Sequence, residues 1–106
     1  MNEKTENIKT SPLPLINLDN SSRWVKIFAA LSDPTRLRIV ELLANAKELS
    51  GTEIATQLEI SLALFCHHSK ILVEAGLLQT RKAGQTKYNS LNWELLNACF
   101  KSFQRN

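Results

Sequence analysis

The sequence has few cysteines and no long hydrophobic run, and both absences exclude whole classes of protein. Two cysteines among 106 residues are too few for the disulfide framework of a small secreted domain. No run of about 18 apolar residues is present, so we expect no membrane span. The polar N-terminus lacks the apolar core of a signal peptide. We therefore expect a cytoplasmic protein with reduced thiols.

The sequence also lacks the arrangements that catalysis would need. No glycine-rich phosphate loop is present. Cys66 and His67 could in principle supply a nucleophile and a base, but adjacent residues on a helix cannot hydrogen-bond in that geometry. No third group that would orient them is apparent. We expect neither an enzyme nor a bound cofactor.

The cluster Cys66-His67-His68 raises the question of a metal site, but its spacing is unfavourable. Adjacent helical residues point about 100° apart, whereas ligand pairs on one helix need i, i+3 or i, i+4 spacing. Cys99 is the only other soft ligand, and the four together match no zinc-finger pattern. We predict no metal site.

What is present indicates one small domain, residues 20–106, behind a polar arm. The arm, residues 1–19, contains two prolines and no hydrophobic periodicity, so we expect it to be mobile. A first helix is predicted near the start of the domain, because apolar residues recur there at i, i+4 and i+7. That stripe consists of Trp24, Phe28 and Leu31.

Three further helices have clear boundary signals. Asp33 is a good N-cap for the second helix, and Ser50 with Glu53 forms a capping box at the start of the third. A fourth helix is predicted from its N-cap Ser61 to Ala75, and Gly76, which follows it, is suited to the left-handed closing position. The third and fourth helices, joined by about three residues, make a helix-turn-helix.

The pattern then changes to a β-hairpin followed by a last helix. Residues 78–90 alternate with a period of two around a turn at Gly84. A hairpin directly after a helix-turn-helix is a wing. Asn92 caps the last helix, whose apolar stripe is Trp93, Leu96, Phe100 and Phe103. The expected fold class is mainly α, a winged helix-turn-helix of about five helices and a two-stranded hairpin.

Positive charge is concentrated in the second half of the chain. Residues 1–60 carry a net charge of −1, residues 61–90 carry +3, and residues 91–106 add +1. A local basic surface favours a polyanion such as nucleic acid. The alternative is an ordinary solvated surface.

Four stretches resemble one known family. "FAALSDPTRLRIVELLA", "ELSGTEIATQLEIS", "CHHSKILVEAGLL" and "TRKAGQTKYNSL" are similar to the ArsR (ArsR/SmtB) family of prokaryotic transcription repressors, over about residues 22–100. The resemblance implies a homodimer that binds operator DNA and is released by an inducer. The sequence does not identify that inducer.

The DNA-contacting residues are predicted on the fourth helix and the wing, because the second helix of a helix-turn-helix enters the major groove. Leu62 and Ala63 suit contact with a thymine methyl group, and His67 and Lys70 suit hydrogen bonds or phosphates. The predicted residues are Ser61, Leu62, Ala63, Cys66, His67 and Lys70 on the helix, and Arg81, Lys82, Gln85 and Lys87 on or near the wing.

The apolar stripes of the first and last helices predict the homodimer interface, since a domain this small cannot hide both alone. The family's metal motifs are poorly matched: "ELSGTEI" has no cysteine where the family has "ELCVCDL", and the last helix offers only Glu94 and Cys99. His68 matches a histidine that the family often carries, and we interpret it as structural. We interpret Cys99 as a buried interface thiol.

Three alternatives stay open. The protein could be a repressor that responds to metal or arsenite, or a winged-helix module that binds proteins rather than DNA. It could also be a thiol-redox sensor, because Cys66 lies on the predicted DNA face about one turn into its helix.

Overall fold

The computed structural model describes residues 18–105, with side chains from residue 22. The predicted arm, residues 1–19, lies outside the described residues except for its last two, which begin the first helix. The elements in order are α1 (Leu18–Leu31), α2 (Pro34–Ala44), β1 (Leu49–Ser50), α3 (Gly51–Leu58), α4 (Leu62–Glu74), β2 (Leu78–Ala83), β3 (Thr86–Leu91) and α5 (Trp93–Lys101). This order confirms the predicted winged helix-turn-helix.

The helix starts lie where the capping residues predict them. The side chains of Asp33, Ser61 and Asn92 each accept a hydrogen bond from the backbone N–H three residues on, at 3.0–3.2 Å. At the start of α3, the Ser50 side chain accepts from the Glu53 N–H at 3.1 Å, and Glu53 accepts from the Ser50 N–H at 2.8 Å. Each cap satisfies backbone donors that the helix itself leaves unpaired.

The two helices of the helix-turn-helix end in left-handed residues. Gly76, after α4, has φ of +82°, and the Leu77 N–H donates to the Leu72 carbonyl at 2.9 Å, as in a Schellman motif. Glu59, after α3, has φ of +58°, which turns the chain toward Ser61 and the start of α4.

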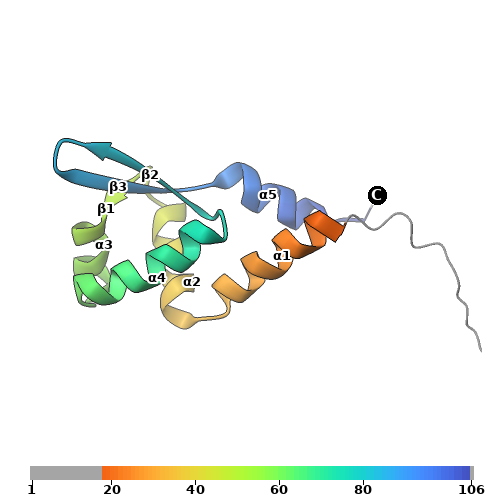
Figure 1. Ribbon diagram of the computed structural model, residues 1–106, viewed down its shortest axis with the longest axis horizontal. Coiled ribbons are helices and arrows are strands. Elements are labelled where there is room, and N and C mark those ends of the chain that lie inside the picture. Colours follow the sequence, from red (N-terminus) through yellow and green to blue (C-terminus); the bar gives the residue numbers. More distant parts are fainter. Residues whose placement is uncertain (1–17, 106) are drawn as a thin grey trace, which may run out of the picture.

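A three-stranded antiparallel sheet of order β1-β3-β2 forms the wing and its base. The short strand β1 was not predicted, and it pairs Ser50 with Tyr88 of β3. A two-residue loop joins β2 to β3, and its first residue, Gly84, has φ of +61°, as a type II′ turn requires. Figure 1 shows the hairpin projecting at the end where α3 and α4 lie.

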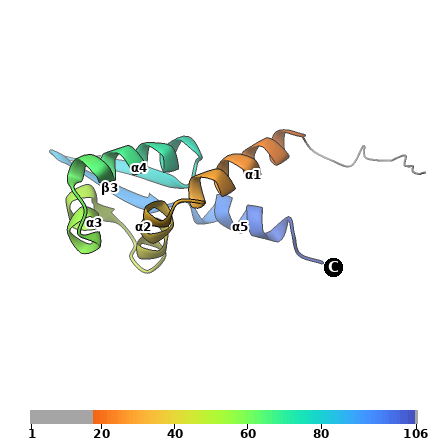
Figure 2. The same cartoon turned by 90° about the horizontal axis from the view of Figure 1, so that it is seen from below.

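The helices α1 and α5 lie together at the opposite end, as Figures 1 and 2 both show. On α5, Leu95, Leu96 and Cys99 turn into the chain's own core. Leu96 therefore does not lie on the outer stripe predicted for it: at 6% exposure it already packs within one chain. The helical period leaves the aromatic residues outside, with Trp93, Phe100 and Phe103 exposed by 49%, 51% and 64%.

No helix that the structure describes between residues 18 and 105 is both long enough and apolar enough to cross a bilayer.

Candidate nucleic-acid interface

The outer face of α4 is exposed over its first two turns. Phe65 and Leu72 are buried, as predicted, and they fix which side of the helix faces the core. The residues predicted to meet DNA from this helix are all exposed: Ser61, Leu62, Ala63, Cys66, His67 and Lys70. The helix thus presents a mixed polar and apolar surface of the kind that reads base edges.

A close approach between α3 and α4 sets the angle of that surface. Phe65 is 3% exposed and packs against the start of α3. A Cβ added to Gly51 would lie only 2.9 Å from Phe65 Cε2. The two helices of the helix-turn-helix can therefore meet this closely because residue 51 has no side chain.

A partly buried polar cluster ties α4 to the start of α2. His68 is 8% exposed, and its Nδ1 lies 3.2 Å from a terminal nitrogen of Arg36 and 3.8 Å from Asp33 Oδ2. Arg36 Nε also donates to the Ala30 carbonyl at 2.7 Å. Because a guanidinium only donates, Nδ1 of His68 is the acceptor in this contact. His68 thus has the contacts that its structural interpretation requires.

Asp33 belongs to this cluster as well as capping α2. The backbone N–H of Arg36 donates to its carboxylate and lowers the pKa of that group. Positive charge on His68, when that ring is protonated, and on Arg36 lowers the pKa further, against an opposing effect of desolvation. The carboxylate form is therefore favoured in the folded protein.

The wing carries two lysines directly opposite each other. Lys82 on β2 pairs in register with Lys87 on β3, and both are exposed, as is Gln85 in the loop between them. Like charges at opposed positions of a hairpin destabilise it. A surface that keeps such a pair offers a concentrated positive charge to a polyanion.

Arg81 is placed differently from those lysines. Its guanidinium forms an ion pair with Glu48, with Nε 3.3 Å from Oε2, and lies 5.0 Å from the centre of the Tyr88 ring. The hydrogen bond between Arg81 and Glu48 raises the pKa of Arg81 and lowers that of Glu48. Arg81, predicted as a DNA contact, is thus engaged at the base of the wing. Glu48 was missed by the sequence analysis, because nothing in the sequence links residues 33 positions apart.

The same helices and wing occur in known regulators. The family model described as "Bacterial regulatory protein, arsR family" matches residues 33–80. The HTH-type transcriptional regulator YceK of Bacillus subtilis is 40% identical over 79 residues, which cover 74% of this chain and 79% of that protein. The chain belongs to the arsR family.

Two further proteins support this membership. The transcriptional repressor SdpR of Bacillus subtilis is 39% identical over 70 residues, 66% of this chain and 77% of that protein. The solved structure of an ArsR-like transcriptional regulator from Rhodococcus sp. RHA1 superposes with a TM-score of 0.74 at 28% identity, over 79% of this chain and 78% of that one. These relatives are transcriptional regulators, not enzymes. The chain is thus an arsR-family transcriptional regulator.

The thiols and imidazoles of this arsR-family chain point in different directions. Cys66 and His67 are exposed, whereas His68 and Cys99 are buried. Burial raises the pKa of the Cys99 thiol. Between residues 22 and 105, no three Cys, His, Asp or Glu side chains are grouped closely enough to hold a metal ion.

Cys66 lies in the groove between α4 and the wing. Two adjoining hollows of about 360 and 420 Å³ share four lining residues, Phe65, Cys66, Lys87 and Asn89. A group added to the Cys66 thiol would therefore stand between α4 and the wing.

Proposed function

We propose that the protein represses transcription by binding operator DNA as a homodimer, with α4 in the major groove and the wing on the phosphate backbone. The observation that carries the proposal is the position of Lys87, which is paired with Lys82 across the wing and lines the same hollow as Cys66 and Lys70 of α4. Base edges and phosphates lie side by side in duplex DNA, so a surface that reads one needs charge for the other. A regulator that binds chromosomal DNA works in the cytoplasm.

The contacts divide between sequence reading and positioning. His67 and Lys70 supply hydrogen bonds to base edges or phosphates, and Leu62 supplies apolar contact to a thymine methyl group. Lys82 and Lys87 neutralise phosphates whatever the sequence. Arg81 joins them only if it leaves Glu48.

The homodimer is supported by the aromatic surface of α1 and α5. Phe28 and Phe103 stack edge to face at 5.8 Å between ring centres, and both remain exposed, as do Trp93 and Phe100. An apolar surface of this kind usually marks an interface. Trp24 and Leu31 are half-buried, whereas Leu96 is buried in the chain's own core and is not part of this surface.

A second copy packed on this surface would set two α4 helices about one DNA turn apart, as paired half-sites require. Sedimentation of a monomer at micromolar concentration would refute this arrangement. The surface lies at the end of the molecule away from the wing (Figure 1), so dimerisation leaves the DNA-binding face accessible.

The experiment that tests DNA binding is a salt titration of a double variant, Lys82→Ala with Lys87→Ala. A dimer of this variant can neutralise four fewer phosphates, two for each subunit. The slope of log affinity against log salt should therefore flatten by about 3.6, equally on operator and random duplexes. His67→Ala should instead reduce the preference for operator over random DNA.

The matched control removes equal charge outside the proposed DNA and dimer surfaces, through Arg38→Ala with Lys47→Ala. It should leave the slope unchanged, since Arg38 is exposed on α2 and Lys47 is exposed in the loop that follows α2. Equal slopes for the wing variant and the wild type would show that the wing is not on the DNA backbone. An equal flattening of the slope in both double variants would indicate only a general effect of net charge.

A further inference from the structure

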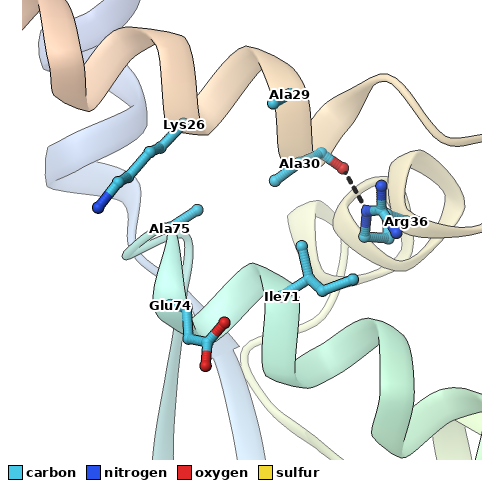
Figure 3. Close-up of a pocket in the computed structure, with 7 residues that line it drawn as sticks. All are labelled: Lys26, Ala29, Ala30, Arg36, Ile71, Glu74 and Ala75. Atoms are coloured by element: carbon cyan, nitrogen blue, oxygen red, sulfur yellow. Dashed lines mark hydrogen bonds between the residues drawn. The ribbon is translucent and has the colours of Figure 1, made fainter.

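A cavity of about 650 Å³ lies between α1, α2 and α4. Small side chains create it, because alanines occupy the positions where the facing helices would otherwise meet (Figure 3). Ala29 and Ala30 come from α1, and Ile71 and Ala75 come from α4 and its C-terminal end. Cavities that hold small molecules have volumes of roughly 300–1,000 Å³ and mostly apolar walls with a few polar groups. This one matches that description.

The charged groups around the cavity are positive in sum. Lys26 from α1 and Arg36 from α2 line it, against Glu74 from α4. Figure 3 shows Arg36 at one end, with Lys26 and Glu74 on facing helices toward the other. A guanidinium suits the planar, two-oxygen geometry of a carboxylate. The alanines and Ile71 between the two ends suit a short apolar body.

The cavity is connected to the DNA-binding helix through one side chain. Arg36 lines the cavity, holds the Ala30 carbonyl of α1 at 2.7 Å and donates to His68 of α4 at 3.2 Å. The remaining N–H groups of the guanidinium can donate to an anion, which then pulls Arg36 against those two acceptors. The cavity wall formed by Ile71 and Glu74 is itself part of α4, so an occupant also presses directly on that helix.

We propose that this cavity is an effector site for a small organic carboxylate, and that its occupancy moves α4 and weakens operator binding. The carboxylate lies against Arg36, the hydrocarbon body lies on the alanines, and Lys26 adds a second positive charge. The regulatory half rests on the proposed DNA-binding function. The binding half does not, because it is measured without DNA.

The binding half is tested by NMR titration of the isotope-labelled protein with benzoate and hexanoate. Saturable shifts are expected at the backbone amides of Ala30, Ile71 and Ala75. The uncharged controls benzamide and hexanamide should bind at least about tenfold more weakly, since they lose a charge-assisted contact. Absence of saturable shifts with both carboxylates, or equal affinity for the amides, would overturn the site.

Variants locate the bound carboxylate. Ala29→Leu fills the cavity from an exposed helical position and should abolish the shifts, whereas Ala44→Leu, exposed at the end of α2, should retain them. Lys26→Gln should weaken carboxylate binding by a fewfold, and Lys47→Gln should not. Unchanged binding in Ala29→Leu would place the carboxylate elsewhere and refute the assignment.

The regulatory half is tested by operator affinity at saturating benzoate. The affinity of the wild type should fall about tenfold, the size of a typical allosteric coupling, while that of Ala29→Leu should be unaffected. Benzoate that binds without changing operator affinity would overturn the regulatory half alone. Failure of the benzoate-free protein to bind any DNA would instead refute the proposed function and leave the NMR result standing.

Discussion

Replacing Glu48 with glutamine tests whether an ion pair holds Arg81 back from DNA. The two side chains are 31% and 56% exposed, and exposed ion pairs contribute little to stability. The fold should therefore survive the change. The amide of the Glu48→Gln variant can still accept one hydrogen bond, but it no longer neutralises the guanidinium, which lies beside Tyr88 at the base of the wing.

The magnitude follows from phosphate neutralisation. One more phosphate contact per subunit steepens the slope of log affinity against log salt by about 0.9, or about 1.8 for a dimer. When the salt concentration rises roughly fourfold, from about 50 to about 200 mM, the variant should therefore lose about 12-fold more affinity than the wild type loses. Binding at the lower salt concentration should be tighter than wild type.

The assay is fluorescence anisotropy on a random-sequence duplex at several salt concentrations. Arg81→Gln in the Glu48→Gln background should remove the extra slope, since the added contact is its own. Glu41→Gln, exposed on α2, makes the same charge change away from the wing and should leave the slope near wild type. A slope unchanged or shallower in Glu48→Gln would show that Arg81 braces the wing and does not contact DNA.

Four other measurements test particular residues. Gly84→Ala should lower the free energy of unfolding by about 1 kcal/mol, because residue 84 has a positive φ. Gly76→Ala should lower it by about 1–3 kcal/mol more, because the added Cβ would also lie 2.9 Å from a leucine of α5. Equal losses of stability for the two variants in denaturant titrations would refute that contact. Asp33→Asn keeps the helix cap but loses the negative charge. Because folding lowers the pKa of Asp33, this variant should be less stable than the wild type at pH 7. The difference in stability should vanish as the pH falls below the pKa of Asp33 in the folded protein. A thiol reagent should label Cys66 alone in the native protein and also Cys99 once it unfolds. Diamide should weaken operator binding by the wild type but not by Cys66→Ser, and equal responses would exclude a thiol switch at this position.

The helix boundaries could be predicted from the sequence because their chemistry is local. Each N-cap side chain bonds a backbone N–H three residues away, so the residue type and its neighbours determine the outcome. The hairpin was predictable for the same reason, since Gly84 marks the turn and the alternation marks the strands. The exposed face of α4 could be predicted from the helical period once Phe65 was assigned to the core.

The remaining features depend on residues that only the fold brings together. Arg81 meets Glu48, and Arg36 meets His68, across 33 and 32 positions of sequence. The strand β1 has two residues, too few for any periodicity. Leu96 was predicted on the outer stripe of α5 because it fits the helical period of that stripe, but it packs into the core with Leu95 and Cys99. The cavity beside Arg36 arises where small side chains of α1 and α4 face each other next to α2, an arrangement that no single segment determines.

Ser50 has a consequence for how quickly the protein can engage DNA. It is both the last residue of β1, paired with β3 of the wing, and the N-cap of α3. The sheet of the wing and the first helix of the helix-turn-helix therefore share this residue, with no flexible linker between β1 and α3. Little conformational entropy remains to be lost when both touch the duplex. Association should then be limited by diffusion and electrostatic steering, with no slower ordering step following the encounter.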